Sequence, residues 1–182
     1  QIANGKIPEL ALLRILDGML SFFERIHSIE TLSPTASYSG VLWNDVKAEH
    51  VYYDPQSGGI TLIDWGNSHF LQADGASVDR QYSRLDDYQQ FLAEMGGLLK
   101  ETAPDLYGGL NWPQGIAPGF TYSEGILPLK SRIQAQLKTL LRELEQTRRV
   151  ERDLLASANP GYAQYVQLEQ VQRQIQMQGE IP

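Results

Sequence analysis

Hydrophobic residues recur at steps of three and four positions in three long segments of the chain. These segments cover residues 8–29, 84–101 and 126–156, and a shorter one follows at 161–177. Such spacing is the period of an amphipathic α-helix, which turns one apolar stripe toward a core. The sequence therefore predicts three long helices and a fourth, glutamine-rich helix near the C-terminus.

Two short runs rich in β-branched and aromatic residues lie between the first two predicted helices. They are HVYYD at 50–54 and GITLID at 59–64, with the turn sequence PQSGG between them. This arrangement predicts a β-hairpin. Residues 66–84 and 104–125 lack a stable period, so we expect an irregular segment and a connection that carries short helices only. The predicted fold class is mainly α, with one small β-hairpin and a helical C-terminal tail.

Composition and charge exclude several classes of protein. The chain has 182 residues, a formal net charge of −7 and no cysteine. The acidic balance argues against nucleic acid as a partner, and the lack of cysteine excludes disulfides, a thiolate nucleophile and cysteine-based zinc sites. No apolar run reaches the roughly 20 residues that a membrane helix needs, and the N-terminus has no signal-peptide pattern. We therefore expect a cytoplasmic protein that binds neither nucleic acid nor membrane.

The periodic segments divide the chain into two parts. Residues 1–125 are predicted to form a domain core, and residues 126–182 its C-terminal helices. Six hydrophobic positions of the second part also follow heptad spacing; they are 126, 129, 133, 137, 140 and 144. The tail is therefore interpreted either as the last helices of the domain or as a coiled coil through which the protein pairs.

Two aspartates flank the predicted hairpin: Asp45 in WNDVKAEH (43–50) and Asp64 in IDWG (63–66). Phosphoryl transfer needs an aspartate to orient or accept the proton of the attacking hydroxyl, a cation for the transferred phosphate, and carboxylates that hold magnesium. Lys47 offers the cation two positions after Asp45. Helix, loop, hairpin and aspartate follow one another in the order that such a site requires.

These motifs resemble the carboxy-terminal lobe of the protein-kinase-like superfamily, whose signatures include the catalytic loop H-R-D-L-x-x-x-N and the D-F-G motif. The resemblance covers residues 8–101 and implies a kinase-like C-lobe. It implies that Asp45 is the catalytic aspartate and that Lys47 binds the γ-phosphate of ATP, as in serine/threonine-type kinases. It also implies that Asp64 binds Mg²⁺ and that Asp87 ties backbone amides of the catalytic loop to the central helix. ATP and Mg²⁺ are the implied cofactors, and a hydroxyl-bearing substrate is the implied partner.

The sequence departs from the family pattern at three positions of the catalytic loop. Trp43 replaces the histidine that packs against the D-F-G aromatic, and Asn44 replaces the arginine that receives a phosphorylated activation loop. His50 replaces the asparagine that binds the second magnesium. An imidazole is a poorer ligand for this hard cation than an amide oxygen, so one metal would be weakened or lost. His50 is therefore interpreted either as a metal and cofactor ligand beside Asp64 or as a side chain that fills the asparagine site.

Three interpretations of function stay open. The family's glycine-rich loop and strand lysine would precede residue 1, so these residues alone are expected to be inactive. The chain is then part of an atypical, bacterial-type phosphotransferase, or a pseudokinase-like module that contacts a protein partner through its helical tail. Only twenty residues separate Gly66 from Asp87, without an A-P-E triplet. This short segment also resembles that of small-molecule phosphotransferases of the aminoglycoside type. That resemblance predicts a substrate pocket lined by residues 104–125.

Overall fold

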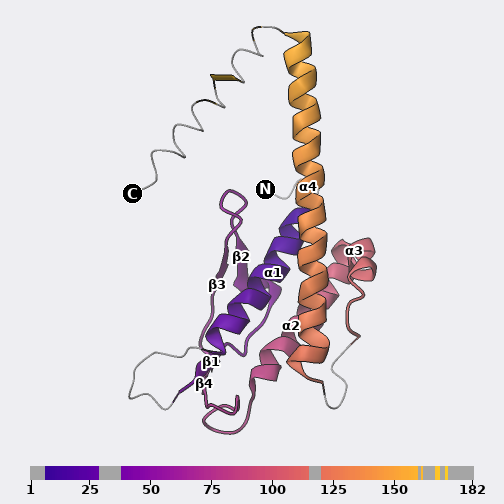
Figure 1. Cartoon of the computed structure of the whole chain (residues 1–182). Helices are drawn as coiled ribbons and strands as arrows, with labels where there is room; N and C mark the ends of the chain where they lie inside the picture. Colours follow the sequence, from indigo (N-terminus) through magenta and orange to yellow (C-terminus); the bar gives the residue numbers. More distant parts are fainter. Residues whose placement is uncertain are drawn as a thin grey trace. The chain divides into compact units, whose positions relative to one another are not determined.

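The chain folds as a mainly helical protein with short antiparallel strand pairs and a long C-terminal helix (Figure 1). The computed structural model describes residues 7–28, 38–114, 120–159, 161, 167, 168 and 171. The chain divides into two compact units, Gln1–Leu137 and Lys138–Pro182. The boundary predicted after residue 125 stays a prediction, and the helix predicted at 161–177 lies largely outside the described residues. Among the described helices, none is both long and apolar enough to cross a membrane.

Helix α1 spans Glu9–Ile26 and confirms the first predicted helix. It starts directly after Pro8, whose fixed φ suits the entry into a helix. Its apolar positions recur at three- and four-residue steps and are buried, so this face forms one wall of the core. The buried residues are Ala11, Leu12, Leu13, Leu16, Met19, Leu20, Phe23 and Ile26.

Helix α2 spans Arg84–Thr102 and confirms the second predicted helix. A capping box fixes its start: the Ser83 hydroxyl accepts a hydrogen bond from the Leu85 amide at 3.3 Å, and Asp86 accepts one from the Ser83 amide at 2.7 Å. Its buried face carries Tyr88, Phe91, Leu92, Met95, Gly96 and Leu99, together with one charged residue, Asp87. That buried carboxylate is the first sign of a polar site within the core.

Within the described residues, four strands of three residues form two separate antiparallel pairs. Strand β2 (Val51–Tyr53) pairs with β3 (Ile60–Leu62), which confirms the predicted hairpin. Strand β1 (Gly40–Leu42) pairs with β4 (His69–Leu71), and Val41 lies opposite Phe70 in the register. The prediction that residues 66–84 form an irregular segment was therefore wrong at His69–Leu71. A strand of three residues is too short to show alternation, and the partner of β4 lies far away in the sequence.

Among the described residues after α2, two short helical segments precede a long helix. Helix α3 (Pro104–Gly109) begins with proline, and a π-helical turn, η3 (Tyr122–Ile126), precedes helix α4 (Leu127–Ala158). The predictions of short helices within residues 104–125 and of a long helix after them are confirmed. Leu129 and Ile133 of α4 are fully buried. The first turns of α4 therefore belong to the core of the first unit.

A polar contact on Glu24 of α1 fixes the start of α4. Lys130 forms an ion pair with Glu24, and the Tyr122 hydroxyl donates a hydrogen bond to the same carboxylate. Burial acts to raise the pKa of Glu24, but the hydrogen bonds from Lys130 and Tyr122 outweigh it and lower this pKa. The pair therefore contributes stability above the ordinary pKa of a glutamate, and this stability is lost as the pH falls through the lowered pKa.

Trp112 packs closely against Gly96 of α2 but not against the neighbouring Gly97. Alanine substitutions at these two positions can therefore be compared. A Cβ atom at Gly96 would lie 2.6 Å from Nε1 of Trp112, which donates a hydrogen bond to the Leu92 carbonyl at 3.0 Å. We expect Gly96→Ala to lower the free energy of unfolding by about 1–3 kcal/mol through overpacking. At Gly97 no atom lies within 4 Å of such a Cβ. There, alanine is expected to raise the free energy of unfolding by about 0.5–1 kcal/mol.

Urea unfolding of both glycine variants, followed by circular dichroism, measures these changes. Changes of the same sign and size in the two variants would contradict the packing of Trp112 against α2.

Candidate functional site

The loop that follows β1 is held by a buried carboxylate of α2. Asp87 is fully buried and accepts hydrogen bonds from the Trp43 amide at 3.0 Å and from the Asn44 amide at 2.7 Å. These two residues directly precede Asp45. The prediction that Asp87 ties backbone amides of this loop to the helix is confirmed. The loop is fixed by charge-assisted hydrogen bonds, which are stronger than neutral ones.

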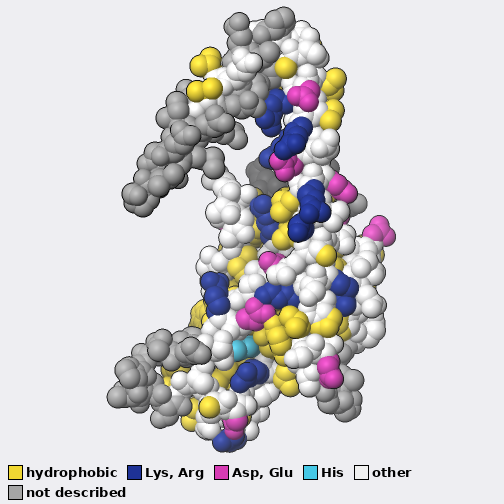
Figure 2. All heavy atoms as spheres, viewed as in Figure 1, with side chains coloured by type: hydrophobic (Ala, Val, Ile, Leu, Met, Phe, Trp, Pro, Cys, Tyr) yellow, Lys and Arg dark blue, Asp and Glu magenta, His cyan; other side chains and the backbone are white. Residues whose placement is uncertain are grey.

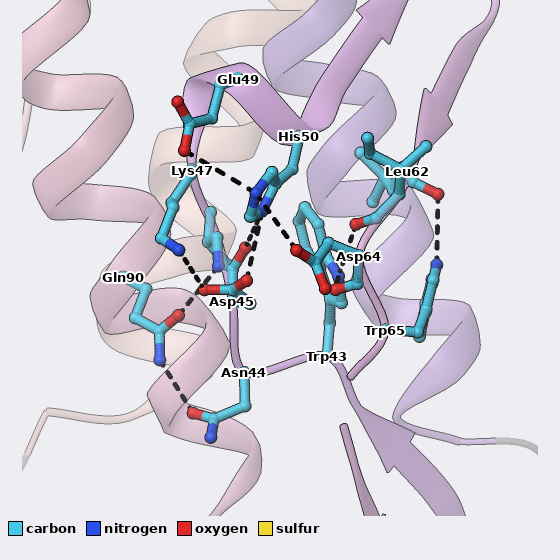
Figure 3. A network of polar contacts seen from close by, with 12 residues as sticks. Trp43, Asn44, Asp45, Lys47, Glu49, His50, Leu62, Asp64, Trp65 and Gln90 are labelled. Carbon is cyan, nitrogen blue, oxygen red and sulfur yellow. Dashed lines mark hydrogen bonds and ion pairs between the residues drawn. The ribbon is translucent and has the colours of Figure 1, made fainter. Parts of the chain in front are cut away.

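Two further side chains of α2 hold the rest of the loop. The Val46 amide donates to Gln90 Oε1 at 2.9 Å, and the Ala48 amide donates to Glu94 Oε1 at 2.9 Å. Gln90 also donates from its Nε2 to the Asn44 side chain at 2.9 Å, as Figure 3 shows. Positions 87, 90 and 94 lie on one face of a helix. This face therefore presents hydrogen-bond acceptors to successive backbone amides of the loop.

The residue that directly follows α1, His27, belongs to the same network. Nε2 of His27 lies 2.7 Å from Asp87 Oδ2, and both side chains are buried. The imidazole also stacks against Phe23 with ring centroids 5.8 Å apart. His27 lies outside the sequence motifs of the predicted site. Its contact links α1 and α2 at the point where the loop is held.

Two residues of the site have left-handed backbone conformations. Asn44 and Asp64 both have φ of 58°. Such angles are uncommon outside glycine, although asparagine and aspartate adopt them more readily than other residues. Non-glycine residues keep a left-handed conformation only where the surrounding structure imposes it. Such residues are frequent at functional sites. Both residues border the polar cluster described next.

Asp45, His50 and Asp64 come together at the centre of Figure 3. One ligand atom from each of the three lies within 4.8 Å of the other two. His50 Nδ1 is 3.3 Å from an Asp45 carboxylate oxygen, and His50 Nε2 is 3.6 Å from Asp64 Oδ2. Asp45 and His50 are buried, whereas the Asp64 side chain is 54% exposed. The cluster therefore opens to solvent on its Asp64 side.

The hydrogen bonds of His50 define which of its nitrogens can bind a metal. Nδ1 lies 3.1 Å from the Asp45 carbonyl oxygen, which only accepts hydrogen bonds, so we assign the proton to Nδ1. Nε2 then carries a lone pair on the side of Asp64. An imidazole fixed in this way by a second hydrogen bond is the usual form of a metal ligand. His50 Nε2 and the Asp64 carboxylate thus offer one nitrogen and oxygens as metal donors, while the Asp45 carboxylate lies beside Nδ1.

Lys47 lies beside the same cluster. Its Nζ is 2.9 Å from Asp45 Oδ1, and its side chain is half-exposed. The hydrogen bond to Asp45 raises the pKa of Lys47, so the ammonium group stays charged at neutral pH. The flexible stem and the exposure of this side chain leave the cation free to bind an incoming anion in place of Asp45.

Two tryptophans form the base of the cluster. Trp43 is fully buried, and its Nε1 donates a hydrogen bond to the Asp64 carbonyl at 3.0 Å. Trp65 lies against it with ring centroids 6.0 Å apart and is 37% exposed. The aromatic residues of the two motifs therefore pack against each other. Through Trp43, the end of the hairpin is fixed to the loop that follows β1.

A separate cavity lies along α2 beside the segment that follows α3. Its volume is about 450 Å³, within the range of small-molecule sites. Tyr107 and Trp112 supply aromatic surface, and Lys100 lies 5.1 Å from the centroid of the Tyr107 ring. The other lining residues are Gln89, Leu92, Ala93, Gly96, Gly97, Pro113 and Gln114.

The structure brings together all four residues that the sequence predicted for the site. They are Asp45, Lys47, His50 and Asp64. Sequence patterns did not indicate His27, which contacts Asp87, or Gln90 and Glu94, which accept hydrogen bonds from loop amides. The only signal for the last two was their helical spacing from Asp87, because no short motif includes them.

Comparisons of the chain with protein-family models, with curated proteins and with solved structures give no match. The fold and the site therefore define the class of protein by themselves. It is a mainly helical protein in which a loop and the end of a hairpin form a partly exposed Asp-His-Asp cluster with an adjacent lysine.

Proposed function

We propose that the chain provides the catalytic half of a metal-dependent phosphotransferase of the protein-kinase-like type. The observation that carries this proposal is the cluster of Asp45, His50 and Asp64, with ligand atoms within 4.8 Å of one another. Lys47 adds the positive charge that a transferred phosphate requires. Phosphoryl transfer relies on positioning and electrostatic stabilisation, and these four side chains supply the charges it needs.

The residues of the cluster fit a divalent cation. Carboxylates suit Mg²⁺ and Mn²⁺, while an imidazole adds affinity for Mn²⁺ and other transition metals. Asp64 and His50 Nε2 would hold the ion, which would offset the charge of a nucleotide phosphate when bound. Asp64 projects into solvent, so an ion reaches it without any rearrangement of the core.

Asp45 is the acceptor of the proton in this proposal. Three side chains of α2 fix its loop, so its carboxylate is positioned before a substrate binds. An arriving phosphate would draw Lys47 away from Asp45. This exchange frees one carboxylate oxygen to accept the proton of a substrate hydroxyl at the moment when the phosphate is in place.

Titration of the chain with ATP in the presence of Mg²⁺, followed by phosphorus NMR, tests the proposal. The described residues include the proposed metal ligands but no glycine-rich loop. We therefore expect a dissociation constant for ATP of about 1 mM. Binding should require Mg²⁺. Lys47→Met should weaken it about tenfold by removing one charge-assisted contact to phosphate.

Lys138→Met is the matched control because it removes an exposed lysine from the second compact unit. It is expected to leave the dissociation constant unchanged. Absence of Mg²⁺-dependent binding, or an equal effect of both lysine substitutions, would contradict the proposal and favour a pseudokinase-like interaction module.

The cavity along α2 favours a small molecule as the acceptor of the phosphate. Four of its lining residues, Tyr107, Trp112, Pro113 and Gln114, fall within the segment in which a small-molecule phosphotransferase would have its substrate pocket. Two aromatic rings, a lysine and two glutamines suit a flat polar molecule with hydroxyl groups. Saturation-transfer NMR with hydroxylated small molecules tests this second candidate, with Gly97→Phe as the variant that fills the cavity.

A further inference from the structure

Glu49 is a carboxylate beside the Asp-His-Asp cluster that the proposed function does not use. It lies in the short 3₁₀ helix η2, Ala48–His50, directly before His50. Its Oε1 is 3.8 Å from His50 Nε2, the same nitrogen that lies 3.6 Å from Asp64 Oδ2. Dashed lines in Figure 3 mark both contacts. Two carboxylates therefore approach one ring nitrogen.

This ring nitrogen forms no hydrogen bond within the described residues. His50 is only 8% exposed, and its hydrogen bond to the Asp45 carbonyl uses Nδ1. The distances from Nε2 to Asp64 and Glu49 exceed that of a hydrogen bond. Ionised carboxylates have no proton to donate to the lone pair of Nε2. The arrangement suits a cation that accepts electron pairs from the nitrogen and from both carboxylates.

The distances allow these three side chains to share one ion. Two ligand atoms at about 2.1 Å from a metal lie about 3.0–3.5 Å apart. The separation of Nε2 from Asp64 is close to this range. Glu49 is not part of the group whose atoms lie within 4.8 Å of one another, so its carboxylate must turn toward Asp64. Because its side chain is 77% exposed, this turn needs a change of rotamer and no rearrangement of the core.

The charges around His50 also favour a cation. Its ring contacts the carboxylates of Asp45, Glu49 and Asp64. The ammonium group of Lys47 pairs with Asp45. In the described part of the chain, no lysine or arginine forms an ion pair with either of the other two carboxylates. A divalent cation between them would neutralise their charge.

We propose that Glu49 completes a metal site with His50 Nε2 and Asp64, and that this site binds Mn²⁺ in preference to Mg²⁺. Mg²⁺ requires near-ideal octahedral geometry with oxygen ligands, whereas Mn²⁺ is bound by carboxylates and gains affinity from an imidazole. Asp45 lies on the Nδ1 side of the ring, outside this site, and stays the proton acceptor. The inference rests on the proposed function, because it concerns the same ion.

Water proton relaxation of the whole chain with MnCl₂, and with MgCl₂ as competitor, measures the affinity for both ions. Glu49→Gln should weaken Mn²⁺ binding about tenfold, because one carboxylate ligand is lost. Glu101→Gln is the matched control, since Glu101 is an exposed glutamate of α2 outside the cluster, and it should leave the affinity unchanged. Repeating both titrations in about 1 M KCl, where the screening length is about 3 Å, separates the loss of a ligand from the loss of a distant charge.

Pulsed electron paramagnetic resonance of the Mn²⁺-loaded chain detects a coordinated nitrogen. We expect a nitrogen coupling that His50→Asn abolishes. Because asparagine offers an oxygen, the preference for Mn²⁺ over Mg²⁺ should also fall about tenfold in this variant. His69→Asn is the matched control: His69 lies 3.3 Å from Asp79, outside the cluster, and its loss should change neither result. Glu49→Gln alters only an exposed side chain, so it tests the site even if His50→Asn unfolds the loop.

Equal Mn²⁺ affinities in Glu49→Gln and Glu101→Gln would overturn the inference. So would the absence of a nitrogen coupling, or a coupling that survives His50→Asn. If Mg²⁺-dependent ATP binding is still observed in that case, the inference alone has failed. The expected Mn²⁺ results without any ATP binding would support the metal site and contradict the proposed phosphotransferase. A chain that binds no Mn²⁺ would overturn both.

Discussion

Replacement of Asp87 by asparagine is expected to lower the free energy of unfolding by about 3 kcal/mol, the cost of breaking a buried charged contact. Asp87 is fully buried and contacts Trp43 N, Asn44 N and His27 Nε2. All three are nitrogen atoms, and both backbone groups are donors. An asparagine must direct its own NH₂ group at one of these donors, which leaves a buried N–H without an acceptor.

Asp86→Asn provides the control for this experiment. Asp86 is the neighbouring aspartate, and its side chain accepts a hydrogen bond from the Ser83 amide. Asparagine keeps an oxygen for that bond, so the expected loss is below about 1 kcal/mol. Urea unfolding followed by tryptophan fluorescence measures both variants, since Trp43 is the residue whose backbone Asp87 holds. A loss at Asp87 no larger than at Asp86 would contradict the anchoring role.

Replacement of Asp64 by asparagine is expected to weaken Mn²⁺ binding about a hundredfold, equal to about 2.7 kcal/mol. The substitution removes one of the two negative charges of the Asp-His-Asp cluster, and carboxylates supply most of the affinity for such hard cations. Asparagine also tolerates the φ of 58° at this position. The substitution therefore changes the ligand without straining the backbone.

Water proton relaxation with Mn²⁺ measures the affinity, and a thermal melt confirms that the fold is kept. Asp74→Asn is the matched control because the two side chains are equally exposed, 54% for Asp64 and 53% for Asp74. Asp74 pairs with Arg80 and lies outside the cluster. An unchanged affinity in Asp64→Asn, or the same loss in Asp74→Asn, would show that no metal binds between Asp45, His50 and Asp64.

Much of the fold followed from local sequence patterns. The bounds of α1 and α2 differ from the predicted ones by at most three residues, because an amphipathic period and a capping box act within a few positions of the chain. The hairpin of β2 and β3 was equally predictable, since a turn sequence joins its strands. The pair of β1 and β4 was not, because its strands are short and their partners are distant in sequence.

The residues of the candidate site also fall into two groups, those indicated by local sequence and those that act through distant contacts. Asp45, Lys47 and Asp64 belong to short motifs, so residue type and spacing pointed to them. His27 belongs to no motif, and its role follows only from its approach to Asp87, sixty positions away. Gln90 and Glu94 likewise act through backbone amides more than forty positions distant.

By itself, the sequence determined where the helices and the hairpin lie and which side chains carry candidate chemistry, because helix period, capping and turn formation are local properties of the chain. Only the tertiary structure decided that His50 directs one nitrogen to the Asp45 carbonyl and the other toward Asp64, and that Lys47 pairs with Asp45. Such contacts depend on how α1, α2 and the hairpin pack together. That packing is set by the summed burial of many distant residues, which no single stretch of sequence contains.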